Sequence, residues 1–244
     1  MSRQIRNLGS IIVDELRFEF VRNALMTIGR GKRLLDLGCG IKPFKHLYEQ
    51  QVDYSVGIDT PFSPHDEESI NALALGHALP FKDGAFDIVL CTEVLEHVPD
   101  PAAVLHEIRR VLSRNGHLIL TTPFLVPLHE GPYDYYRYTM YGLKYLCEQQ
   151  DLQVEKLQPF SGLTGVTISF LVQAQLKFWY FFWKATKFPG LYTIYNPIIF
   201  LLIFLPQRAY LSFLRLVSRI PALKTVHEKL TYTTKGYGLV ALKK

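Results

Sequence analysis

The chain has 244 residues, of which 48% are hydrophobic and 20% are charged. This composition supports a well-filled core and excludes a globally disordered chain. The three cysteines, Cys39, Cys91 and Cys147, are too few and too scattered for a disulfide framework, and they fit a reducing compartment. The first residues lack the apolar stretch of a signal peptide, so we expect no cleavable leader.

Charge is distributed unevenly along the chain. Residues 1–160 carry 16 Lys and Arg against 21 Asp and Glu, a balance of −5. Residues 161–244 carry 11 basic residues against one acid, a balance of +10. Such a basic segment indicates an anionic partner, for which nucleic acid and an acidic membrane surface are the two usual candidates.

The N-terminal part alternates between predicted strands and helices. An amphipathic helical stretch comes first, at residues 11–28. The pattern then predicts strands at 33–37, 54–58, 86–91, 117–121 and 152–157, and helices at 45–50, 101–112 and 141–149. Asp100 is the expected N-cap of the helix at 101–112, and Asn115-Gly116 is expected to close it. This alternation predicts an α/β fold with a mostly parallel sheet covered on both faces.

A glycine turn follows the first strand, in the sequence Asp36-Leu37-Gly38-Cys39-Gly40. Glycines there let the backbone approach a ligand closely. The third glycine of a dinucleotide fingerprint would fall at position 43, where the chain has Pro43, and this argues against NAD or FAD. Asp59 ends the second strand, where a carboxylate can accept hydrogen bonds from a ribose diol.

Four segments, in this order and spacing, resemble the class I S-adenosylmethionine-dependent methyltransferases, and the type 11 group in particular. They are LLDLGCG at 34–40, VGIDT at 56–60, ALPFKDGAFDIVLCTEVLEHVPDP at 78–101 and LHEIRRVLSRNGHLILTTPF at 105–124. The resemblance implies a doubly wound, seven-stranded Rossmann-like sheet and S-adenosylmethionine as the cofactor.

The resemblance also implies a set of cofactor contacts. The turn formed by Gly38, Cys39 and Gly40 would pass under the methionine end of the cofactor, with Asp36 near its ammonium and Asp59 at the ribose hydroxyls. His77 and Ala78 would flank the adenine, and Glu93 would lie near the methionine moiety. Leu75 stands where family members often have an acid, so the usual contact to the adenine amino group is expected to be replaced.

The segment after the fifth strand, residues 128–138, is dense in polar and aromatic side chains and is expected to face the methyl acceptor. A base is needed only for a hydroxyl or a protonated amine. His129 is the expected base and His97 the second candidate; otherwise each is a loop or packing residue. We expect Tyr133, Tyr136 and Arg137 to contact the substrate, although ordinary packing is an alternative for the tyrosines. The remaining histidines show no metal-ligand spacing, so we expect no metal: His46, His65, His106, His117 and His227.

Residues 161–230 are expected to be an insertion before a last strand at 237–242, so that the methyltransferase domain comprises residues 1–160 and 231–244. The insertion and its entry contain two uncharged stretches, 157–176 and 188–207, separated by six aromatic residues between Lys177 and Lys184. Glutamines or prolines interrupt both stretches, and a spanning helix needs about 20 predominantly apolar residues, so a dipping helical hairpin is favoured over a single span.

A basic amphipathic helix is expected to follow, with Arg208, Arg215 and Arg219 on one face, as in interfacial membrane elements. A soluble helical lid is the alternative. Because the insertion is expected to leave and re-enter the sheet at its ligand-binding edge, it would lie beside the acceptor pocket.

The sequence therefore predicts an enzyme that transfers a methyl group from S-adenosylmethionine to a small-molecule, glycan or lipid-linked acceptor. We expect it in the cytoplasm, peripheral or monotopic at the inner face of the cell membrane. A soluble small-molecule methyltransferase, a nucleic-acid-binding protein and a cofactor-binding scaffold without catalysis are the alternatives. Nucleic acid is disfavoured because the basic segment is rich in Phe, Trp, Leu and Ile.

Overall fold

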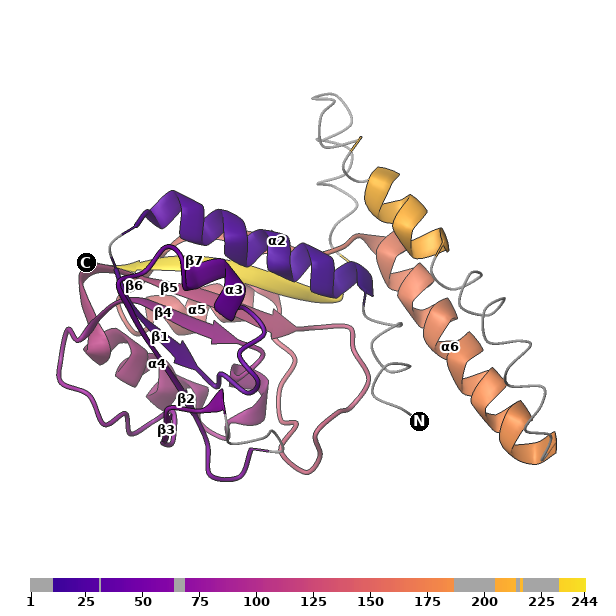
Figure 1. Ribbon diagram of the computed structural model, residues 1–244, viewed down its shortest axis with the longest axis horizontal. Helices are drawn as coiled ribbons and strands as arrows, with labels where there is room; N and C mark the ends of the chain where they lie inside the picture. The colour runs from indigo at the N-terminus through magenta and orange to yellow at the C-terminus, as the bar shows by residue number, and fades with distance from the viewer. Residues whose placement is uncertain (1–10, 31, 64–68, 187–204, 214–215, 217–232) are drawn as a thin grey trace. The chain divides into compact units, whose positions relative to one another are not determined.

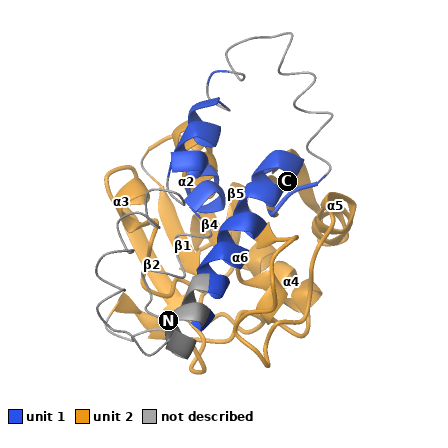
Figure 2. Cartoon of the chain, turned by 90° about the vertical axis from the view of Figure 1, so that its right-hand side faces the viewer, with its two compact units in different colours: residues 1–16, 159–235 blue, residues 17–158, 236–244 orange. Residues whose placement is uncertain are grey.

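The structure is a computed structural model that describes residues 11–30, 32–63, 69–186, 205–213, 216 and 233–244 (Figure 1). The chain divides into two compact units, coloured separately in Figure 2. The first comprises residues 1–16 and 159–235, and the second comprises residues 17–158 and 236–244. The expected division into a methyltransferase domain and a functional insertion stays a prediction.

A seven-stranded sheet forms the centre of the second unit, in the order β3-β2-β1-β4-β5-β7-β6. Its strands are β1 (Arg33–Leu37), β2 (Tyr54–Asp59), β3 (Ala72–Leu73), β4 (Phe86–Thr92), β5 (Leu112–Pro123), β6 (Leu152–Pro159) and β7 (Gly236–Lys243). The strands from β3 to β5 are parallel, and β7 runs antiparallel to β5. The predicted α/β fold is confirmed. The chain order reverses between β1 and β4, which is where sheets of this kind bind ligands.

Helices cover both faces of this sheet. Figures 1 and 2 place α2 (Ile11–Ile28) and α3 (Lys45–Tyr48) over one face, and α4 (Pro101–Val111) and α5 (Met140–Glu148) over the other. Residues 34–37 of β1 and 88–91 of β4 are buried without interruption, as expected for parallel strands covered on both sides. Asp100 caps α4 as predicted, because its carboxylate accepts from the backbone N–H of Ala103 at 3.0 Å.

The end of α4 differs from the sequence prediction. The helix stops at Val111, and β5 starts at Leu112 instead of at His117. Between the paired residues Phe86–Leu112 and Ile88–His117, β5 contains extra residues that bulge out of the pairing with β4. A Cβ on Gly116 would lie 2.9 Å from the carbonyl oxygen of Ser113, so this bulge requires glycine at position 116. Asn115-Gly116 is therefore a turn within a strand, and reading it as a helix stop was wrong.

Asp87 holds this bulge of β5 in place. Its carboxylate accepts from the Ser113 hydroxyl at 2.9 Å and from the Arg33 guanidinium at 2.9 and 3.0 Å. These hydrogen bonds hold the pKa of Asp87 well below its usual range, and those from Arg33 have the largest effect. The contact links β1, β4 and β5 at the end of the sheet opposite to their carboxyl ends.

In the first unit, α6 (Leu163–Thr186) is the longest described helix. Val166, Val172 and Leu176 are buried, whereas a set of large apolar side chains on the same helix is exposed: Phe170, Leu171, Phe178 and Phe181. Within the described residues, no helix has both the length and the hydropathy required to cross a bilayer.

The segment 205–213 is helical, and its Tyr210 and Leu211 pack against Ile12. Arg208 forms an ion pair with Glu15. Glu15 thus compensates the charge of Arg208 within the protein. The sequence had predicted that Arg208 faces a membrane together with the other arginines of its helix. Arg215, Arg219 and the apolar run 198–204 lie outside the described residues.

Candidate active site

The glycine turn leaves β1 at the edge of the sheet where ligands are expected. Gly38 has a φ of +67° and Gly40 a φ of +48°, both in the left-handed region that favours glycine. A Cβ on Gly38 would also lie 2.3 Å from Cγ2 of Val94. The turn is tied to β2, because the backbone N–H of Cys39 donates to the Ile58 carbonyl at 3.0 Å. The side chain of Cys39 is buried.

Asp59 joins the end of β2 to the glycine turn. Oδ2 accepts from the backbone N–H of Gly40 at 2.8 Å and from the Ser63 hydroxyl at 3.2 Å, while Oδ1 accepts from the N–H of Thr60 at 2.7 Å. A carboxylate offers about four acceptor positions. Donors among the described residues fill three of them, which leaves room for one further donor beside the turn.

Asp36 is buried beneath the same edge. Its Oδ2 accepts from the Tyr48 hydroxyl at 3.2 Å, and only 1% of the residue is exposed. Burial raises the pKa of Asp36 to about 7, against the lowering effects of the Tyr48 hydrogen bond and the charge of Lys42. A cation placed next to this carboxyl would favour its ionised form, so the site suits a positively charged group.

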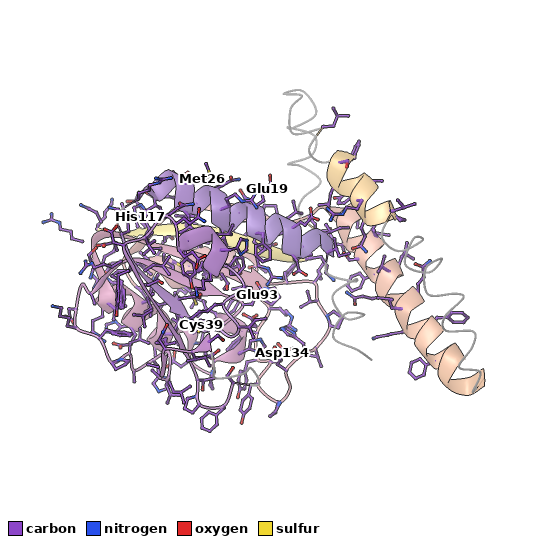
Figure 3. All side chains as sticks on the ribbon, in the orientation of Figure 1. Glu19, Met26, Cys39, Glu93, His117 and Asp134 are labelled. Carbon is purple, nitrogen blue, oxygen red and sulfur yellow. The ribbon has the colours of Figure 1, made fainter. Side chains whose placement is uncertain are left out.

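Glu93 follows β4 with a φ of 55°. Its Oε1 accepts from the Thr121 hydroxyl at 2.9 Å, and its Oε2 lies 3.2 Å from Nη1 of Arg17 on α2. Glu93 thus connects the ends of β4 and β5 to α2. Figure 3 labels Glu93 and Cys39 in the same region of the second unit, with His117 toward the other end of the sheet. Arg17 carried no signal in the sequence, because its partner lies far along the chain.

The residues expected to flank the adenine lie on the loop after β3. His77 and Ala78 are exposed, whereas Leu79 is buried and its backbone N–H donates to Glu107 of α4 at 2.9 Å. Leu75 is bridged to Ala78. The loop therefore offers exposed side chains and backbone groups at the position where an acid is often found in the family, and the adenine contacts stay a prediction.

The loop after β5 is organised by an ion pair that the sequence did not reveal. Asp134 accepts from both guanidinium ends of Arg137, with a distance of 2.7 Å between Nη2 and Oδ2, and from the backbone N–H of His129 at 2.9 Å. The hydrogen bonds from Arg137 contribute most to holding the pKa of Asp134 well below its usual range. Arg137 is therefore engaged by this loop, and its predicted substrate contact is untested.

The expected acceptor-side residues lie near one another. The rings of His97 and His129 meet edge to face, with 4.9 Å between their centroids. The Tyr136 hydroxyl donates to the Pro99 carbonyl at 2.9 Å, while the Tyr133 ring is half exposed. Thus His97, on the short 3-10 helix Leu95–His97, and His129 approach each other from the ends of β4 and β5.

These features, a glycine turn tied to an acid-ended second strand in a seven-stranded sheet, agree with the result of a family comparison. A model described as "methyltransferase domain" matches residues 12–162. The chain belongs to this methyltransferase family. The resemblance to class I S-adenosylmethionine-dependent methyltransferases is thereby confirmed.

Curated relatives match part of the chain. The ubiquinone biosynthesis O-methyltransferase of Pseudomonas aeruginosa (strain LESB58) is 30% identical over 129 residues, which cover 48% of this chain and 53% of that protein. The protein of the same name from Hahella chejuensis is 32% identical over 123 residues, covering 45% and 50%. The methyltransferase thus aligns with about half the length of these relatives.

Among solved structures, the [4+2]-cyclase SpnF has a TM-score of 0.55 at 19% identity and covers 91% of this chain and 79% of its own. The YcgJ protein from Bacillus subtilis has a TM-score of 0.50 at 16% identity, covering 66% and 81%. At these identities the likeness concerns the fold alone. One of the two is named for a cyclisation, so the fold does not determine the reaction.

Replacing Asp36 with Asn should change how stability depends on pH. An ordinary Asp ionises near pH 4 in the unfolded chain, whereas folded Asp36 keeps its proton to about pH 7. Wild-type stability should therefore decrease as pH rises through this interval, by a few kcal/mol at most. Asn cannot ionise but still accepts from Tyr48, so the variant's Tm relative to wild type should rise from pH 5 to pH 7.5. Thermal unfolding measures this.

The exposed Asp53 provides the control, because Asp53→Asn should show no such rise. A Tm difference between Asp36→Asn and wild type that stays constant over this range would contradict the assignment.

Proposed function

We propose that this protein uses S-adenosylmethionine to methylate a small-molecule acceptor. The observation that carries the proposal is the hydrogen bond of 2.8 Å from the Gly40 N–H to Asp59, which holds a carboxylate beside the glycine turn. A carboxylate at this position of such a fold can accept hydrogen bonds from ribose hydroxyls. The turn lies at the switch point of the sheet, between β1 and β4. Membership of the methyltransferase family supports the same reading.

The described residues fit this cofactor at both ends. Asp59 retains acceptor capacity for a ribose hydroxyl, because protein donors fill three of its roughly four positions. Asp36 is a buried carboxyl whose pKa is raised to about 7, and the cationic methionine end would favour its ionised form. Gly38 keeps the turn free of a side chain that would strike Val94.

The cofactor supplies a methyl group on a sulfonium, which is already activated for in-line displacement. The protein's task is then to hold the acceptor in line and exclude water, and positioning of this kind can contribute about 7–11 kcal/mol. His129 is the proposed base for a hydroxyl acceptor, with His97 as the alternative. Asp134 would orient His129 through its backbone N–H, which it accepts at 2.9 Å. Tyr133, Tyr136 and Arg137 are the proposed acceptor contacts.

The names of the relatives suggest what kind of molecule accepts the methyl group. Proteins named ubiquinone biosynthesis O-methyltransferase suggest a small molecule that presents a hydroxyl group. We propose further that the acceptor is held at a membrane surface, as a lipid or a lipid-linked sugar. This rests on the +10 balance of residues 161–244 and on the exposed Phe and Leu side chains of α6. A soluble enzyme whose α6 serves as a lid is the alternative.

Asp59→Asn should weaken binding of S-adenosylmethionine. The substitution turns one acceptor oxygen into a donor, so the hydroxyl contact and one turn contact are lost. Hydrogen bonds to charged groups are worth about 1.5–3 kcal/mol, which corresponds to a loss of roughly 10- to 100-fold in affinity. Isothermal titration calorimetry measures this, with Asp53→Asn as the matched acid-to-amide control. Equal affinities for wild type and Asp59→Asn would remove Asp59 from the cofactor site.

Methyl transfer itself can be tested with cofactor labelled on the methyl group. We expect the purified protein to label a product in a cell extract, and expect the Asp59→Asn variant to label less at subsaturating cofactor. Partition between organic solvent and water separates lipid-linked from water-soluble acceptors. Cofactor binding without a labelled product in either phase, from extracts of several sources, would favour the scaffold without catalysis.

Membrane association predicts a role for the exposed rings of α6. Phe178 and Phe181 are 61% and 64% exposed, and burying a Phe contributes about 1.5–3 kcal/mol. Replacing both with Ser should lower recovery with anionic vesicles in flotation by at least about tenfold. Met26→Ser, at an equally exposed position on α2, is the control. If the wild-type protein does not float with vesicles of any composition, α6 acts as a lid or serves another purpose.

A further inference from the structure

Three side chains with metal-binding chemistry converge where β4 and β5 end. Glu96, His97 and His129 each offer one ligand atom, and these atoms all lie within 4.8 Å of one another. The sequence did not indicate this, because His129 lies on a different loop and no short spacing relates it to the Glu-His pair. The fold brings the two loops together at the edge of the sheet.

Glu96 is the most unusual member of the group. The residue is 0% exposed, and neither carboxylate oxygen has a hydrogen-bond partner among the residues that the structure describes. The nearby charge of Glu93 also acts on Glu96 and repels a second carboxylate. A buried carboxyl without donors is costly to maintain. A bound cation is the partner that would compensate both the burial and the repulsion.

The hydrogen bonds of His97 indicate which of its ring nitrogens is available to a metal. Nδ1 of His97 lies 2.8 Å from the carbonyl oxygen of Tyr133, to which it donates, and this leaves the lone pair on Nε2. That Nε2 lies 3.6 Å from Oε1 of Glu96. In metal sites the ring nitrogen that does not bind the metal usually donates to a carbonyl or a carboxylate. His97 meets this condition.

His129 has the same kind of support on its Nδ1, which lies 3.3 Å from the Pro127 carbonyl oxygen and 3.4 Å from Oδ2 of Asp134. Nη2 of Arg137 is also 3.4 Å from this nitrogen, but Arg137 is paired with Asp134. When Nδ1 donates to Pro127 or Asp134, the Nε2 lone pair of His129 is available.

The charges around the group suit a cation. Glu130 lies 3.7 Å from Nε2 of His97, and Asp134 contacts His129. Among the described residues, the basic groups that act on Glu96 are Arg17 and Arg137, which pair with Glu93 and Asp134 respectively. With Glu96 and Glu130 added, the acidic groups outnumber the basic ones.

We propose that Glu96, His97 and His129 bind a divalent cation of the zinc type. Two imidazole nitrogens and one carboxylate are a donor set that suits zinc, and three protein ligands leave a coordination position open. The side chain of His129 is 36% exposed, so this position can be reached from solvent. The site would bind an oxygen of water or of the acceptor. Binding of the cation is independent of the proposed function; only its use in methyl transfer rests on that function.

Zinc titration of the chelator-treated, full-length protein tests the proposal. We expect calorimetry with zinc chloride alone to show about one ion per chain. Glu96→Gln and His129→Ala should each lower the affinity at least 100-fold, and Asp134→Asn, which removes an outer contact, about 10- to 100-fold. His106→Ala is the matched control, because His106 is an exposed histidine on α4, and its affinity should equal that of wild type.

Two results would overturn the proposal. One is a wild-type protein that binds no zinc; the other is zinc binding that Glu96→Gln and His129→Ala leave unchanged. Circular dichroism checks the fold of each variant, and if Glu96→Gln does not fold, His129→Ala on its exposed loop decides. Cobalt offers a second readout, because a site with two imidazoles should give visible absorption that His129→Ala abolishes.

Measuring S-adenosylmethionine affinity on the same samples separates the two claims. Intact cofactor binding without zinc binding would overturn only the metal site. Zinc binding without cofactor binding would overturn the proposed function and leave the metal site standing.

Discussion

The parallel pairing of β1 with β2 and with β4 is the constraint on which the site depends. In this register Leu37 lies beside Ile58 on one side and Cys91 on the other, so the chain leaves three adjacent strands at one edge. The glycine turn, Asp59 and Glu93 are therefore neighbours although they are far apart in sequence. Gly38 and Gly40 make this arrangement possible, because their positive φ turns the chain sharply enough for Asp59 to reach the Gly40 N–H.

Features that depend on local sequence were predictable. The glycine turn, the acid at the end of β2 and the Asp100 cap each rest on a few adjacent residues, and the structure has all three. Arg17 was missed because a basic residue on an amphipathic helix looks like any solvated side chain until Glu93 is placed beside it. The start of β5 was misread for a similar reason: the Asn-Gly pair predicts a turn, but only the pairing of β5 with β4 on both sides of it shows that the turn lies inside a strand.

Glu96 illustrates a different limit. A glutamate next to a histidine after a strand reads as a solvated loop, and nothing in the segment EVLEHV shows which acid turns inward. The structure turns Glu96 in and ties its backbone carbonyl to the N–H of Tyr135 at 2.8 Å. The loop after β5 thereby fixes the backbone of Glu96. Burying this carboxyl lowers the stability of the fold, and unfavourable groups of this kind are found most often where proteins bind ligands.

The two roles considered for His129 exclude each other at one atom. A general base accepts the acceptor's proton on a free lone pair, whereas a ligand keeps that lone pair on the cation. Because Nδ1 of His129 faces Pro127 and Asp134, Nε2 is the atom for which the roles compete. A cation held there would lower the pKa of a bound hydroxyl, which removes the need for a base. Asp134 supports either role, since its contacts fix the loop and the ring whichever partner Nε2 receives. The chemistry at this edge is thus decided by what occupies the space beside Glu96.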